Sequence, residues 1–133
     1  MKPSIRIFSN EPNYCDILKL CVLFGSLILD EALPIDMKLE FYGAAGGVTG
    51  SHMVLHARDL RIGIDAGLFQ GGDTDRNQDG FGHDPNRLKA MILTHAHVDH
   101  SGRIPLFINE GFKGSVCCTH ATRDLYLDIQ VGD

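Results

Sequence analysis

The chain has 133 residues, enough for one small domain with its own hydrophobic core. Its composition, 44% hydrophobic and 22% charged, is typical of a globular protein and excludes a disordered or fibrous chain. The formal net charge of -5 excludes attraction of nucleic acid by the chain as a whole. If RNA is the substrate, the basic surface must be local or lie elsewhere.

The first 36 residues carry no motif and little periodicity. Their most apolar stretch, residues 17–29, is shorter than the roughly 20 residues that span a bilayer. Acidic residues flank this stretch, which is unlike a secretory signal. We therefore expect no membrane segment. The character of the sequence changes at Met37, where a methionine that could start a protein is followed by a strand pattern. We therefore predict that residues 1–36 are an N-terminal extension, or that they lie upstream of the natural start. A short N-terminal helix is the alternative.

From residue 37 onward, strands come first and then alternate with helices. The hydrophobic pattern predicts strands at 38–42, 51–57, 60–65, 88–94 and 115–118, and helices at 99–110 and 122–131. The second and third strands read as a hairpin around Arg58-Asp59, and residues 67–87 read as a long polar loop. This order indicates a mixed α/β layer structure. Because the pattern stops inside its second helix, we expect an incomplete domain with an unpaired sheet edge.

Four cysteines are present, and none form a C-x-x-C pair: Cys15, Cys21, Cys117 and Cys118. We read them as reduced thiols, which predicts a cytoplasmic protein.

The segment that carries chemistry is THAHVDHSG, residues 94–102, directly after an apolar strand. Extended residues at i and i+2 point the same way, so His95 and His97 can converge on one cation. Asp99 and His100 follow at the first turn of a helix and can face a second cation. Imidazole nitrogen and carboxylate oxygen are ligands that zinc accepts. Two metals a few ångströms apart would hold a hydroxide between them, the nucleophile for hydrolysis.

H-x-H-x-D-H is the signature of the metallo-β-lactamase superfamily, and residues 95–100 resemble it fully. The resemblance implies an αββα sandwich with a two-zinc site at the sheet edge, of which this chain is the N-terminal part. It assigns His95 and His97 to the first zinc ion, and Asp99 and His100 to the second.

Residues 41–51, 64–71 and 101–125 also resemble the β-CASP branch of that superfamily and its bacterial relatives, which are mostly RNA-processing nucleases. The resemblance covers residues 37–133. Asp65 matches the acidic residue of the family's first motif, which implies a place beside the histidines, where it would fix the orientation of a ring. With Asp99, it is our candidate for a catalytic role. The alternative for Asp65 is a turn aspartate before Gly67.

The resemblance also implies parts that this sequence does not supply. The family needs a third histidine for the first metal, an aspartate bridging both metals, and a nucleic-acid-clamping domain, all from later segments. We therefore expect a truncated front piece whose RNA partner is held by the missing downstream region. Zinc held by His95 and His97 alone would be weakly bound, because two ligands leave the tetrahedral shell half open.

Three functional hypotheses follow from these residues. The first is a zinc-dependent hydrolase that cleaves RNA as a phosphodiesterase. The second keeps the fold and changes the substrate to a thioester or lactam, although residues 43–51 and 65–71 argue against it. The third is a non-catalytic fragment that binds metal poorly, which is our expectation for the 133 residues alone.

Weaker patterns are interpreted structurally. Residues 43–51 are rich in glycine but lack the lysine of a phosphate-binding loop, so we expect a tight turn bordering the site. Asp75-x-Asn77-x-Asp79-Gly80 matches half of a calcium loop without its closing glutamate, so a solvated loop is expected. The isolated histidines are not assigned to metal: His52, His56, His83 and His120.

Overall fold

The computed structural model describes residues 36–131. Residues 1–35 hold nearly all of the expected N-terminal extension, and they lie outside the described residues together with residues 132–133. The domain boundary expected at residue 37 therefore stays a prediction. Within residues 36–131, no helix is long and apolar enough to cross a membrane.

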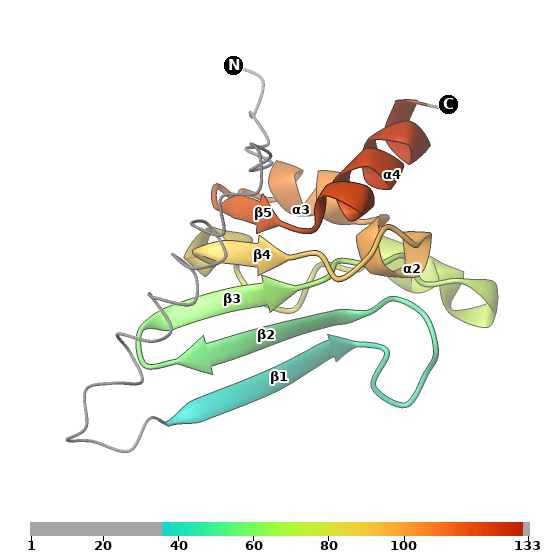
Figure 1. Cartoon of the computed structure of the whole chain (residues 1–133). Helices are drawn as coiled ribbons and strands as arrows, with labels where there is room; N and C mark the ends of the chain where they lie inside the picture. Colours follow the sequence, from blue (N-terminus) through green and yellow to red (C-terminus); the bar gives the residue numbers. More distant parts are fainter. Residues whose placement is uncertain (1–35, 132–133) are drawn as a thin grey trace.

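One five-stranded sheet organises the described residues (Figure 1). The strands lie side by side in chain order: β1 Met37–Gly43, β2 His52–Ala57, β3 Leu60–Ile64, β4 Ala90–Ile92 and β5 Ser115–Cys117. β1, β2 and β3 pair antiparallel, whereas β4 pairs parallel to both β3 and β5. The predicted hairpin is confirmed, and Arg58 at its tip has a left-handed φ of 52°. Among the described strands, β1 and β5 are the two edges of the sheet.

The helices are α2 Val98–Ser101, α3 Ile104–Asn109 and α4 His120–Val131, with 3-10 turns η1 Gly71–Gln78 and η2 Pro85–Arg87. The expectation of one helix over 99–110 is wrong, because the chain breaks between α2 and α3. Gly102 lies so close to Leu68 and the Val98 carbonyl that a side chain there would collide with them. Arg103 leaves helical geometry at φ -98° and ψ 7°, and Pro105 is the second residue of α3, where its missing N–H costs no helical bond.

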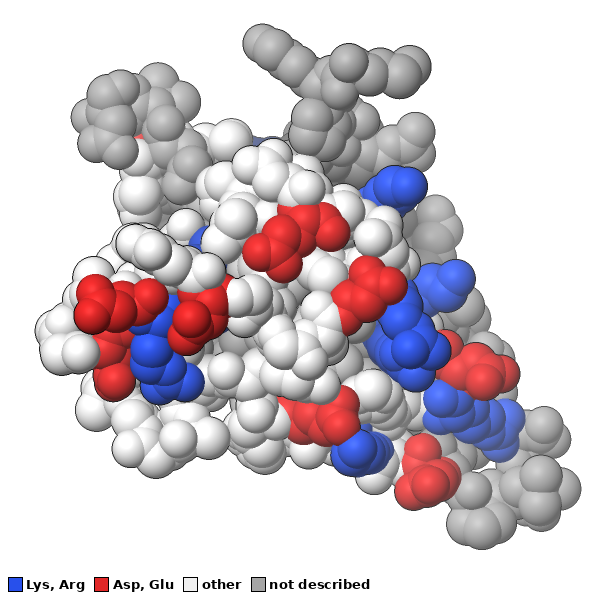
Figure 2. Space-filling model, turned by 180° about the vertical axis from the view of Figure 1, so that it is seen from behind, with Lys and Arg blue, Asp and Glu red and all other residues white. Residues whose placement is uncertain are grey.

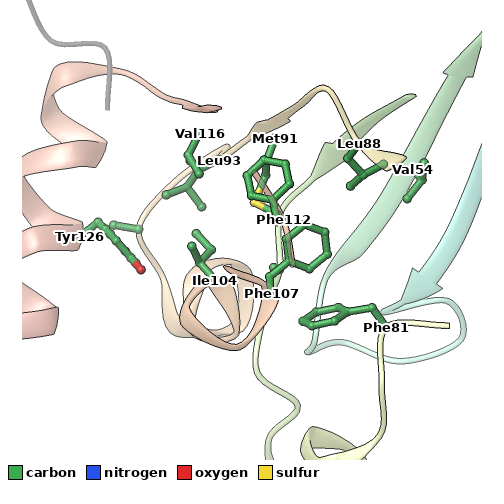
Figure 3. Close-up of a cluster of buried hydrophobic side chains, with 12 residues drawn as sticks. Val54, Phe81, Leu88, Met91, Leu93, Ile104, Phe107, Phe112, Val116 and Tyr126 are labelled. Carbon is green, nitrogen blue, oxygen red and sulfur yellow. The ribbon is translucent and has the colours of Figure 1, made fainter. Parts of the chain in front are cut away.

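The hydrophobic core lies on one face of the sheet (Figure 3). Val54, Met91 and Val116 point to this face from β2, β4 and β5, as their mutual pairing requires. Side chains of the helices and loops pack against them: Phe81, Leu88, Ile104, Phe107, Phe112 and Tyr126. The opposite face carries apolar residues of β1 that remain exposed, Met37, Leu39 and Phe41. Leu39 and Phe41 share a face as predicted.

The segment predicted as a long polar loop, residues 67–87, is more ordered than that prediction implies. It forms η1 and η2 and buries Phe69 and Phe81. Buried Arg103 holds these rings in place, since its guanidinium lies 4.9 Å from the Phe69 ring centre and 4.5 Å from that of Phe81. Its Nε also donates to the Gly67 carbonyl at 2.9 Å. Phe69 and Phe81 are 12 positions apart, so their burial left no periodic pattern in the sequence.

Candidate metal centre

The histidine-rich segment lies where β4 ends, beside the end of β3. Parallel strands bring their carboxyl ends to one sheet edge, which is where open α/β sheets place their sites. The Asp65 N–H donates to the Ile92 carbonyl at 2.9 Å, and the Ala66 N–H donates to the His100 carbonyl at 2.8 Å. The end of β3 is thus hydrogen-bonded both to β4 and to the turn that carries Asp99 and His100.

The glycine-rich turn between β1 and β2 closes one side of this edge, as the sequence predicted. The Ser51 N–H donates to the Asp99 carbonyl, and the Gly67 N–H donates to the Ser51 carbonyl, each at 2.9 Å. Gly67 has no room for a side chain, because a Cβ would overlap the Asp99 carbonyl. Three segments distant in sequence therefore meet at Asp99 through backbone atoms alone.

Asp65 is the centre of the hydrogen bonds at the site. It is 1% exposed and has a left-handed φ of 58°. The Thr94 N–H donates to its Oδ1 at 2.8 Å, and the Thr94 hydroxyl lies 3.0 and 2.9 Å from its two oxygens. His100 Nδ1 lies 2.8 Å from its Oδ2. The turn-aspartate alternative therefore does not account for the contacts of this side chain.

These contacts determine which ring nitrogens carry protons. An ionised carboxylate only accepts hydrogen bonds, so His100 Nδ1 carries the proton that it donates to Asp65. The single Thr94 hydroxyl proton is directed to Asp65, so His95 Nδ1, 3.0 Å from Thr94 Oγ1, is the donor of that bond. In the neutral rings of both histidines, Nε2 keeps its lone pair. That tautomer, held by a carboxylate or hydroxyl, is the form in which histidine binds metal.

The four residues of the predicted ligand set lie together. The ring centres of His95 and His97 are 4.7 Å apart, and those of His95 and His100 are 4.0 Å apart. Asp99 Oδ2 lies 3.6 Å from His100 Nε2. His97 is exposed, whereas His95, Asp99 and His100 are half-buried. The rings rest against one another, and within residues 36–131 no three His, Cys, Asp or Glu side chains are arranged to hold one ion. Imidazole nitrogens and a carboxylate oxygen are suitable ligands for a metal ion, and the assignment of these four residues as ligands stays a prediction.

Residues of the weaker sequence patterns have partners within the domain or lie at its surface. His120 is exposed at the first residue of α4. Asn77, in the calcium-like pattern, uses its amide to bind the backbone of Phe69, with Oδ1 accepting at 2.7 Å and Nδ2 donating at 2.8 Å. Asn77 therefore anchors the loop. His56 pairs with Glu40 at 2.7 Å on the neighbouring strand.

Sequence reasoning missed two residues of this region, Thr94 and His52. Thr94 immediately precedes the motif, and a hydroxyl one residue before His95 was the signal that could have identified it. His52 is 0% exposed, and its Nδ1 lies 2.6 Å from the Asp65 carbonyl oxygen. No periodicity links it to the motif, because it precedes Asp65 by 13 positions and a strand reversal.

His52 should make the stability of the domain depend on pH. Burial lowers its pKa to about 4, whereas an unfolded histidine titrates near about 6.5. The unfolded chain binds more protons between these values, so the stabilisation is complete above pH ~6.5 and is lost as pH falls toward the folded-state pKa. We expect this group to remove about 3 kcal/mol from the free energy of unfolding over that interval.

Urea titrations across this pH interval measure the effect, and His52→Asn is the control. The variant should lose this part of the pH dependence, whatever the other groups contribute. Equal pH slopes for the natural chain and the variant would show that His52 does not titrate with folding.

Comparison with known proteins now decides the family. Residues 64–128 match the metallo-beta-lactamase superfamily. The chain belongs to that superfamily. In fold it is similar to YhfI of Bacillus subtilis, a metallo-beta-lactamase fold protein, with a TM-score of 0.50 and 22% identity over 69% of this chain and 40% of that one. The predicted α/β class is confirmed.

Curated relatives of this metallo-β-lactamase chain carry names from RNA metabolism. It is 46% identical over 86 residues to a ribonuclease of Thermus thermophilus, covering 65% of this chain and 20% of the relative. It is 37% identical over 100 residues to transcription termination factor FttA of Methanosarcina mazei, covering 71% and 15%. It is 30% identical over 101 residues to endoribonuclease ysh1 of Aspergillus fumigatus, covering 73% and 12%. The chain thus spans a fifth or less of the length of these relatives.

Proposed function

We propose that this metallo-β-lactamase chain supplies the front half of a two-zinc site in a protein that cleaves RNA. His95 and His97 would hold the first ion, and Asp99 and His100 the second. The observation that carries the proposal is the set of bonds around Asp65. They occupy Nδ1 of His100 directly and Nδ1 of His95 through Thr94, which leaves the lone pairs of both Nε2 atoms available to a metal ion.

Zinc bound here would supply a hydroxide nucleophile and neutralise charge on the phosphoryl oxygens. The residues of this chain would orient the metal ligands and the attacking water. Asp65 orients the imidazole of His100 and, through Thr94, that of His95. Asp99 is half-buried and lies close to His100, where its carboxylate could accept a hydrogen bond from the attacking water.

RNA as the substrate is supported by the names of the ribonuclease and endoribonuclease relatives. The charge of this chain offers RNA little by itself. Figure 2 shows basic and acidic side chains interspersed on the face seen from behind, and the net charge is -5. Phosphate backbones are held mainly by lysine and arginine. We therefore propose that these residues belong to a longer cytoplasmic enzyme, in which a downstream region holds the RNA.

Cleavage of end-labelled single-stranded RNA by the full-length protein that contains these residues tests the proposal. His97→Ala should lower the cleavage rate by at least about 100-fold, the upper end of what residues outside the coordination shell cost. His97 is suited to this test because it is exposed and its side chain has no hydrogen bond to a described residue, so the fold should survive.

His120→Ala is the matched control, since it removes an exposed histidine of the same domain and should leave the rate unchanged. Equal cleavage rates for His97→Ala and the natural protein, with zinc present, would exclude the proposed site.

A further inference from the structure

A second pair of histidines lies on the core side of the sheet, behind the metal centre. His52 on β2 is fully buried, and His83, between η1 and η2, is half-buried. Their Nε2 atoms are 2.7 Å apart. The His52 ring lies among aromatic side chains, with ring centres of Phe81 and Phe107 at 5.3 and 5.4 Å, which leaves it no freedom to turn.

The protons of this pair follow from its partners. His52 Nδ1 lies 2.6 Å from the Asp65 carbonyl oxygen, which can only accept, so Nδ1 carries the proton. The Nε2 of a neutral His52 is then an acceptor, and His83 Nε2–H must be the donor across the 2.7 Å contact. The two hydrogen bonds therefore point the same way: His83 donates to His52, and His52 donates to the backbone carbonyl of Asp65.

Asp65 needs such support. A left-handed φ in a residue other than glycine costs on the order of 1 kcal/mol and persists only where surrounding bonds hold it. The Asp65 N–H is held by the Ile92 carbonyl, and its own carbonyl is held by His52. With both of its own backbone groups held, its carboxylate stays directed at Thr94 and His100.

We propose that His52 is a positioning residue for the metal centre, with its proton held on Nδ1 by the Asp65 carbonyl. His52 touches neither metal nor substrate. It holds the backbone of Asp65, and Asp65 holds the imidazole of His100 with Nε2 available. The role in metal binding rests on the proposed function, whereas the chain of hydrogen bonds is testable without metal.

Nitrogen-15 spectra of the histidine side chains of the full chain, recorded without metal at neutral pH, give the first test. His52 should carry its proton on Nδ1, and the Nδ1 of His100 should be protonated and hydrogen-bonded. A proton on Nε2 of His52 would overturn the proposal, and this result does not depend on any variant folding.

Variants of His52 give the second test. His52→Leu removes the donor to Asp65, so His100 should show a mixture of tautomers and Co²⁺ should bind about 10-fold more weakly. His52→Asn places an amide N–H near the position of Nδ1 and should restore both readouts. A merely structural role would lower the melting temperature of both variants and leave the His100 tautomer unchanged, which would contradict positioning. If the full-length natural protein that contains these residues binds no Co²⁺, the proposed function fails, while the His100 spectra still decide the role of His52.

Discussion

Replacing Gly67 with alanine is expected to destabilise the domain by at least about 3 kcal/mol, the upper range for overpacking a filled interior. The added Cβ would overlap the backbone carbonyl of Asp99 and lie 2.8 Å from the backbone nitrogen of His100. Backbone atoms cannot move away as a flexible side chain can, so α2 would have to shift. The displaced turn carries two of the four predicted ligands.

Urea unfolding followed by circular dichroism measures this effect, with Gly72→Ala as the control. Gly72 lies exposed in η1, and a Cβ there would meet no atom within 4 Å. The control should change stability by no more than about 1 kcal/mol. Similar stability for the two variants would show that β3 and α2 are not packed as closely as the structure places them.

Replacing Asp65 with alanine should cost about 2 kcal/mol in stability and weaken Co²⁺ binding by 10- to 100-fold. The substitution leaves the Thr94 N–H without its acceptor and frees the imidazole of His100. Alanine also tolerates the left-handed backbone of this position poorly.

Asp65→Asn separates the two effects. Its remaining oxygen can still accept from the Thr94 N–H, so the loss of stability should be smaller than with alanine. Its amide nitrogen cannot accept from His100 Nδ1, so the loss of Co²⁺ affinity should be as large. Tight Co²⁺ binding by both variants would show that Asp65 does not set the orientation of His100.

The parts of this molecule that the sequence predicted well are those encoded over short distances. The hairpin β2–β3 follows from strand alternation around Arg58-Asp59. The four proposed ligands lie together because they fall within six residues, whereas their role as ligands stays a prediction. The place of Asp65 beside the histidines came from resemblance, because Asp65 and His100 are 35 positions apart and no local pattern indicates their contact.

The predictions that failed depend on tertiary contacts. The break between α2 and α3 arises where Gly102 meets Leu68, and the order of residues 67–87 arises where Arg103 meets two aromatic rings. The His52–His83 pair joins positions 31 apart. Periodicity describes which face of an element is apolar, and it contains no information about such pairings.

Titrating the full-length protein that contains residues 94–102 with Co²⁺ is the sharpest test of whether the histidine-rich turn binds metal. Visible absorption reports when Co²⁺ replaces water with imidazole ligands. A metal site at this turn should give a saturable spectrum that is lost in His95→Ala and His97→Ala and retained in His120→Ala. Absence of a saturable spectrum, or one that persists in both substitutions of the motif, would contradict it.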